Sequence, residues 1–235
     1  MGLSVRKKNM TDWEELQKRV HRMKDRVVIG IVGKYFNLKS CRDTYISVIE
    51  SIKHASWHFN VKPDIQWLDA EAYEHHPEKL QELQNIHGII VPGGFGKRGI
   101  EGMIAAAGFA RAHKIPYFGL CLGMQVAVID CARNVAGLEK ANSEEFDQEC
   151  THPVIHLMKS QKEAMAKNHY GGTMRLGSYP CGIEDGTIAR RAYGKPLITE
   201  RHRHRYEFNN TYRERLARHG LVPSGVSPDG MLVEM

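Results

Sequence analysis

The sequence has no long apolar run. No stretch of about 18 consecutive apolar residues occurs, which is the length that a membrane-spanning helix needs. The N-terminal stretch "MGLSVRKKNMTDWEELQKRV" also lacks the apolar core of a signal peptide. We therefore expect a soluble, cytoplasmic protein without membrane association.

Cysteine is scarce and irregularly spaced. The 235 residues include five cysteines, an odd number, and no two of them form a C-x-x-C pair. This spacing favours neither a disulfide framework nor a zinc site, and it fits a reducing compartment. The five are Cys41, Cys121, Cys131, Cys150 and Cys181.

The sequence carries an excess of basic residues but no motif of a nucleic-acid-binding protein. The formal net charge is +6, but the sequence has no RNA-binding signature and no helix-turn-helix pattern. We interpret the excess as solvated surface and expect no nucleic-acid partner. The stretch "RHRHR" (201–205) raises the question of a metal site. We expect His202 and His204 to point to opposite faces of an extended segment, and therefore predict no metal.

Short β-branched runs alternate with helical patterns along most of the chain. Strand-like runs lie at 26–35, 64–70, 87–96 and 115–121, and helical patterns cover 43–59 and 100–114. The first helical pattern places Ile46, Ile49 and Ile52 at helical spacing. The alternation predicts an α/β fold with three layers, in which a mostly parallel, flavodoxin-like sheet carries helices on both faces.

The two ends of the chain do not show this alternation of strand-like and helical patterns. Residues 1–26 are charged and predict a linker with a short amphipathic helix around Trp13 and Leu16, so that the domain itself spans 27–235. After about residue 140 the alternation weakens. There we expect short strands joined by turns over 173–194 and a polar helix over 209–220.

Glycine clusters follow the third and fourth strand-like runs. In open parallel sheets, ligands bind beyond the carboxyl ends of the strands, so "PGGFG" and "GLCLGMQ" are candidate site loops. The second places Cys121 between Gly119 and Gly123, the layout of a nucleophile elbow. A helix beginning there would point N–H groups at the thiol, favour the thiolate and stabilise an oxyanion. A buried cysteine acting as a small apolar side chain is the competing interpretation.

The sequence resembles the class I glutamine amidotransferases and, within them, the glutaminase domains of CTP synthases. The motifs that carry the resemblance occur in the family's order over residues 27–235. They are "VGKY", "VPGGFGKRGIEGMI", "PYFGLCLGMQ", "ANSEEF", "GGTMRLG", "ERHRHRYEFNN" and "SPDGMLVE".

The resemblance implies that Cys121 attacks the side-chain amide of L-glutamine, giving a γ-glutamyl thioester and ammonia. It assigns the oxyanion donors to the backbone of Gly94 and Leu122. It assigns the charged end of glutamine to Glu145 and Arg205, a carboxylate for the ammonium and a guanidinium for the carboxylate. The implied substrate-binding positions are Gly94, Leu122, Gly123, Met124, Gln125, Glu145 and Arg205.

The resemblance also implies regulation and partners. GTP would activate glutamine hydrolysis through a lid matching residues 168–178, where Gly171 and Gly172 supply hinge freedom and Arg175 meets a phosphate. No cofactor is expected in this domain. ATP and Mg²⁺ belong to the family's synthetase domain, which aminates UTP to CTP and would act from the same parent chain or in trans. The full-length protein would be a homo-oligomer, a tetramer.

The family's general base lies in a His-Pro-Glu stretch that the 235 residues do not contain, and no phosphate-binding G-x-x-x-x-G-K-[ST] loop occurs. We therefore expect the amidotransferase domain to be incomplete at its C-terminal end. Two alternatives stay open. One is a catalytically incomplete glutamine- or nucleotide-binding regulatory domain, and the other is a different cysteine hydrolase of the same fold, such as a γ-glutamyl peptidase.

Overall fold

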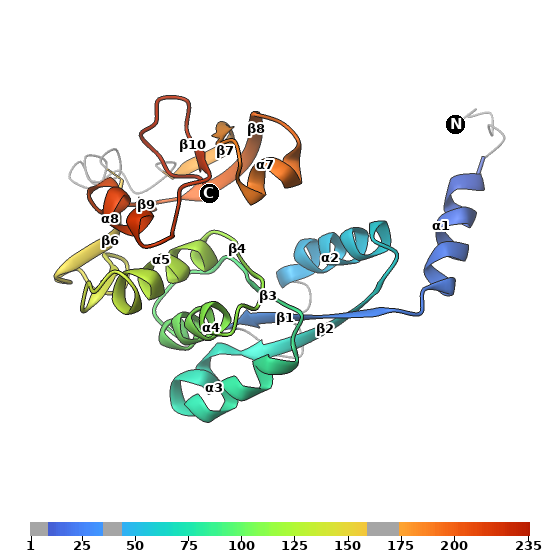
Figure 1. Ribbon diagram of the computed structural model, residues 1–235, viewed down its shortest axis with the longest axis horizontal. Helices are drawn as coiled ribbons and strands as arrows, with labels where there is room; N and C mark the ends of the chain where they lie inside the picture. The colour runs from blue at the N-terminus through green and yellow to red at the C-terminus, as the bar shows by residue number, and fades with distance from the viewer. Residues whose placement is uncertain (1–8, 35–43, 159–173) are drawn as a thin grey trace, which may run out of the picture.

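The computed structural model describes residues 9–34, 44–158 and 174–235. A four-stranded parallel sheet in the order β2-β1-β3-β4 forms the centre of the larger, N-terminal part (Figure 1). The elements up to α5 are α1 (Thr11–Arg22), β1 (Arg26–Gly33), α2 (Ile46–His58), β2 (Lys62–Asp69), α3 (Ala70–His75), η2 (Pro77–Asn85), β3 (Gly88–Val91), α4 (Ile100–Ala112), β4 (Tyr117–Gly119) and α5 (Leu122–Asn134).

The crossovers place helices on both faces of this sheet. Helix α2 lies on one face, and α3 and α4 lie together on the other (Figure 1). This arrangement follows from right-handed crossovers, because the chain moves outward from β1 to β2 and then back across the sheet to β3 and β4. The predicted α/β class and parallel sheet are confirmed.

Burial follows the sequence pattern in β1 and most of α2, whereas the edge strands β2 and β4 keep exposed positions such as Phe118. Ile31 and Val32 of β1 are completely buried, and Ile49 and Ile52 of α2 are buried against the sheet. Ile46, which the helical spacing placed with them, is 52% exposed because α2 begins at this residue. Helix α1 has the predicted place but buries no residue, and it extends away from the sheet at the end opposite the C-terminal strands (Figure 1).

The C-terminal part forms two small sheets that the sequence did not reveal as such. One has the order β5-β6-β9 and the other β10-β7-β8. Its elements are β5 (Ala141–Ser143), β6 (His152–Leu157), β7 (Arg175–Ile183), α7 (Ile188–Tyr193), β8 (Leu197–His204), β9 (Tyr206–Phe208), η3 (Asn210–Tyr212), α8 (Arg213–Arg218) and β10 (Gly225–Val226).

Two local expectations change in this part. Residues 188–193 are helical rather than a strand, because Thr187 caps the helix by accepting a hydrogen bond from Arg190 N–H and Gly194 ends it in the left-handed conformation. The polar helix expected over 209–220 is present in a shorter form, as η3 and α8. None of the helices in the described ranges is long and apolar enough to span a membrane.

Candidate active site

The turn from β4 into α5 is the centre of the site. Cys121 occupies it as the N-cap residue of α5, with φ 56° and ψ −106°. A positive φ is rare for a residue with a side chain and marks a strained turn that the surrounding packing maintains. The sharp strand-to-helix corner predicted from G-x-C-x-G is therefore present, and it brings the thiol to the carboxyl edge of the sheet.

The glycines on both sides of Cys121 are required by close backbone packing. A Cβ atom on Gly119 would lie 2.3 Å from the carbonyl carbon of Gly123. A Cβ atom on Gly123 would lie 1.9 Å from the carbonyl oxygen of Val91, at the end of β3. The first turn of α5 can therefore sit directly on the strand ends only because both positions lack a side chain.

Replacing Gly123 by alanine should destabilise the fold, because the new methyl group meets backbone rather than a movable side chain. We expect the free energy of unfolding to fall by about 3 kcal/mol, the upper range for overpacking. Gly182→Ala is the matched control, since its Cβ would meet nothing closer than 3.6 Å. Urea unfolding of both variants measures the difference, and equal midpoints would contradict this account of the turn.

The loop after β3 lies against the thiol. The register of β3 and β4 pairs Val91 with Gly119, so the two glycine clusters begin side by side. A Cβ on Gly93 would lie 3.3 Å from the Cβ of Cys121. The backbone N–H groups of Leu122 and Gly94 both donate hydrogen bonds to the Cys121 sulfur. The two oxyanion donors named from the sequence thus converge on the thiol from different loops.

Opposing effects set the acidity of this thiol. Burial raises the pKa of Cys121 above its ordinary value, and the nearby Glu145 carboxylate also raises it. The N–H groups of Leu122 and Gly94 lower the pKa, because they stabilise the thiolate. Burial outweighs the donors, so the helix terminus does not by itself produce the thiolate that the sequence analysis expected.

A pocket of about 250 Å³ opens at Cys121. Five of the predicted site residues line it, and they come from four separate segments of the chain. These are Gly94, Cys121, Gln125, Glu145 and Arg205. The lining also includes residues without a role in the sequence analysis, namely Phe95, Met174, Arg203, His204 and Tyr206. Leu122 contributes its N–H group, whereas Gly123 and Met124 are not among the residues that line this pocket.

The family model described as "Glutamine amidotransferase class-I" matches residues 40–235. The chain belongs to this family. The match covers every residue of the pocket, from the loop after β3 to Tyr206.

Relatives of this amidotransferase chain carry the name CTP synthase. The protein of Carboxydothermus hydrogenoformans is 52% identical over 235 residues, and that of Roseiflexus castenholzii is 53% identical over 237 residues. Each alignment covers all of this chain but only 43% and 41% of the relative. The chain therefore spans about two fifths of the length of these curated relatives.

A solved structure shares the fold. It is described as the glutaminase domain of Trypanosoma brucei CTPS with bound acivicin. It aligns with a TM-score of 0.80 and 42% identity, covering 88% of this chain and 78% of that one. At this identity and coverage the likeness extends beyond the central sheet to the C-terminal part of the amidotransferase domain.

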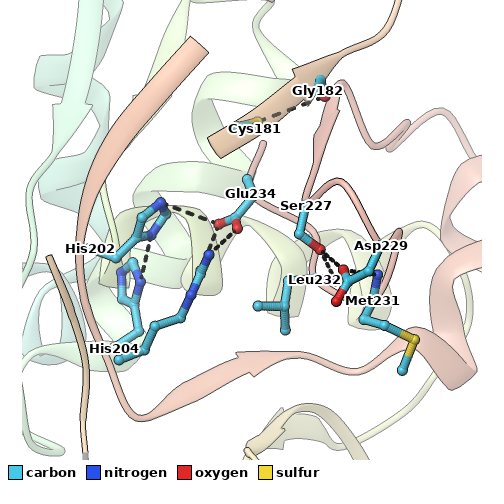
Figure 2. A network of polar contacts seen from close by, with 10 residues as sticks. Cys181, Gly182, His202, His204, Ser227, Asp229, Met231, Leu232 and Glu234 are labelled. Atoms are coloured by element: carbon cyan, nitrogen blue, oxygen red, sulfur yellow. Dashed lines mark hydrogen bonds and ion pairs between the residues drawn. The ribbon is translucent and has the colours of Figure 1, made fainter. Parts of the chain in front are cut away.

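His202 and His204 correct an expectation from the sequence. Their rings lie on the same side of β8, with the two Nδ1 atoms 3.2 Å apart (Figure 2). The prediction of opposite faces was wrong because side chains at i and i+2 of a strand share a face. Burial and the neighbouring His202 lower the pKa of His204 to about 4, and burial also lowers the pKa of His202. Both rings are therefore neutral at pH 7.

A buried ion pair lies behind the two histidines. The guanidinium of Arg175 donates to both carboxylate oxygens of Glu234, at 3.0 and 2.6 Å. Nε2 of His202 lies 3.5 Å from the same carboxylate (Figure 2). Arg175, expected to meet a phosphate, is thus engaged with Glu234. Gly171 and Gly172, its predicted companions in the lid, lie outside the described residues.

Metal-ligating side chains do not gather elsewhere in the described ranges. Over residues 9–34, 44–158 and 174–235, no group of three or more His, Cys, Asp or Glu side chains could hold a metal ion. His54, His58, His75 and His76 are exposed, as the sequence indicated. Cys121, Cys131, Cys150 and Cys181 are free thiols. Cys41 lies outside the described residues.

Proposed function

We propose that this chain is the glutamine-hydrolysing domain of a CTP synthase and that Cys121 is its nucleophile. The observation that carries the proposal is the convergence of two backbone N–H groups on a strained, pocket-lining thiol. An acyl-transfer site needs this combination, because the nucleophile must reach the carbonyl carbon while fixed donors meet the oxygen that becomes negative.

The chemistry follows from these positions. The Cys121 sulfur attacks the side-chain amide carbon of glutamine, and the N–H groups of Gly94 and Leu122 stabilise the resulting oxyanion. The carbon–nitrogen bond then breaks, the nitrogen takes up a proton and leaves as ammonia, and a γ-glutamyl thioester remains. Water hydrolyses the thioester to glutamate and restores the thiol.

Glutamine would be held by its charged end. Glu145 and Arg205 line the same pocket as Cys121, which supports a carboxylate for the α-ammonium and a guanidinium for the α-carboxylate. Gln125, buried at the start of α5, supplies an amide that can hydrogen-bond the substrate. Free glutamine and the glutamyl end of a γ-glutamyl peptide both carry these two charged groups, so the preference for free glutamine rests on the relatives named CTP synthase.

Removing either charge should weaken glutamine binding while leaving the fold intact. We expect Arg205→Ala and Glu145→Gln each to cost about 1.5 to 3 kcal/mol of binding, the range for a charge-assisted contact. The glutamine side chain at position 145 has nearly the size of the original one. Its Oε1 can therefore still accept from Gly96 N–H, as Glu145 does at 3.1 Å. Protection of Cys121 from alkylation by added glutamine measures the affinity.

Arg201→Ala is the matched control, because Arg201 is exposed on β8, the strand that leads to Arg205, and lies outside the pocket. It should bind glutamine like the wild type. If both pocket variants also retain wild-type affinity, the assignment of the charged end is wrong. Ammonia release by the chain separates turnover from the alternative, a domain that binds glutamine or a nucleotide without hydrolysing it.

The rest of the proposal concerns the longer protein. The curated relatives are named CTP synthase and are more than twice as long as this chain, which supports a synthetase domain as the partner that receives ammonia. That domain would use ATP and Mg²⁺ to activate UTP, in a cytoplasmic homo-oligomer. GTP activation through residues 168–178 remains part of the proposal, and it requires Arg175 to leave Glu234 if this guanidinium is to meet a phosphate.

A further inference from the structure

Lys34 is a buried cation next to the site that the proposed mechanism does not use. It directly follows Gly33, the last residue of β1, and is only 3% exposed. A buried lysine must find hydrogen-bond partners to offset the loss of water around its ammonium group. Lys34 is not among the residues that line the pocket, so any part in catalysis passes through its partners.

Those partners belong to the loop after β3. Nζ of Lys34 donates to the carbonyl oxygen of Phe95, at 3.2 Å, and to that of Gly96. The Lys34 backbone is also tied to this region, because the Arg98 guanidinium donates to its carbonyl oxygen at 3.0 Å. Lys34 and the segment 95–98 are therefore joined by three contacts that run in both directions.

One peptide group connects Lys34 to the substrate pocket. The Phe95–Gly96 peptide gives its oxygen to Lys34, while its N–H donates to Oε1 of Glu145 at 3.1 Å. The neighbouring residue Gly94 supplies the N–H that reaches the Cys121 sulfur. The ammonium group thus fixes the loop between the two groups that glutamine must meet, an oxyanion donor and the carboxylate for its α-ammonium.

We propose that Lys34 is a positioning residue for glutamine hydrolysis, holding the 94–96 loop so that Gly94 N–H and the Glu145 carboxylate face the substrate together. The inference rests on the proposed function. It also explains the lysine of the "VGKY" stretch, because the end of β1 delivers a cation beneath the loop that follows β3, its neighbour in the sheet.

Several charged groups surround this ammonium. Burial is the main cause that lowers the pKa of Lys34 to about 8. The Arg98 guanidinium acts in the same direction, and the Glu145, Glu74 and Glu71 carboxylates act in the opposite one. The group is therefore charged below about pH 8 and becomes neutral as the pH rises above it. The hold on the loop carbonyls should weaken over the same range, because a neutral amine is the poorer donor.

The test compares two reagents at one thiol. A glutamine-like α-chloroketone needs the donors and Glu145 to reach Cys121, whereas iodoacetamide needs only an accessible thiolate. In Lys34→Met, we expect chloroketone labelling to slow by about 10²-fold, the effect of a misplaced reacting group. Iodoacetamide labelling should change by less than about 3-fold, since Cys121 itself stays in place. Lys97→Met, an exposed lysine of the same loop, is the control and should behave like the wild type.

The outcomes separate this inference from the proposed function. A wild-type chain that the chloroketone does not label would overturn the proposed function itself. A labelled wild type with an equally fast Lys34→Met would overturn only the role of Lys34. Equal slowing with both reagents would also overturn it, because Lys34 would then merely support the fold.

A measurement on the wild type serves if Lys34→Met does not fold. The quantity measured is the rate of chloroketone labelling divided by the rate of iodoacetamide labelling. This ratio does not depend on the ionisation of Cys121, because both reagents need its thiolate. We expect this ratio to fall as the pH rises through about 8, where Lys34 loses its charge. The ratio is corrected for the ionisation of the probe's own α-amino group, measured on the free probe. A ratio that does not change between pH 7 and 9 would overturn the inference.

Discussion

Cys121→Ser should abolish covalent labelling of the chain by a glutamine-like α-chloroketone, while the wild type is modified on the peptide that contains residue 121. Cys121 alone among the described cysteines lines the pocket. Its sulfur accepts hydrogen bonds from two backbone N–H groups, which would hold the oxyanion of the adduct. Mass spectrometry of the digested protein locates the label.

The rate at which iodoacetamide labels Cys121 should increase between pH 7 and 9. Burial raises the pKa of the Cys121 thiol, so the thiolate fraction is small at pH 7 and grows as the pH approaches that pKa. Cys150→Ser is the matched control, because Cys150 is also partly exposed but lies outside the pocket. It should retain full labelling at Cys121. Preferential modification of Cys181 or Cys41 would show that the nucleophile is wrongly assigned.

Glu234→Ala should lower the free energy of unfolding by about 3 to 5 kcal/mol, the cost of leaving one partner of a buried ion pair uncompensated. The Glu234 side chain is 4% exposed and the Arg175 side chain 12%. Removing Glu234 would leave that guanidinium buried beside two neutral histidines, without an acceptor for its bidentate donors. Urea unfolding monitored by circular dichroism measures the change.

Glu214→Ala provides the comparison. Glu214 forms an ion pair with Arg218 on α8, but the two side chains are 86% and 76% exposed, so its loss should cost about 0 to 1 kcal/mol. A double variant, Arg175→Met with Glu234→Leu, should recover part of the stability because it removes both charges. Equal stabilities of Glu234→Ala and Glu214→Ala would mean that water reaches Arg175 in solution.

The central sheet was predictable because its strands are short apolar runs separated by helical patterns, although the edge strands β2 and β4 keep exposed positions. Runs such as "VVIGIV" favour a buried strand because they are short, β-branched and followed by glycine, and the glycine-rich stretches between the runs mark where strands end. The C-terminal sheets were not predictable in the same way. Strands β7 and β8 have few fully buried positions, and their pairing joins residues 15 to 29 positions apart, from Gly182 with Leu197 to Arg175 with His204.

The residues of the candidate site also differ in whether the sequence alone could identify them. Cys121 and its two glycines form a local signature whose backbone requirement can be recognised from the sequence. Glu145 and Arg205 became candidates only through the resemblance to a family, because a single carboxylate or guanidinium in a sequence is ordinary surface. Lys34 and His204 had no role assigned, because Lys34 contacts a loop distant in the sequence and the fold brings His204 to the pocket. The position of Lys34, immediately after a buried strand, was the available signal.

The backbone conformation of Cys121 lowers the stability of the fold while it places the thiol at the pocket. A side chain held at φ 56° and ψ −106° costs of order 1 to 3 kcal/mol, which the folded chain recovers elsewhere. Glycine would occupy this corner without that cost and would close the same turn between β4 and α5. Selection for folding alone would therefore favour a residue other than cysteine at this turn. The presence of the thiol indicates a functional requirement.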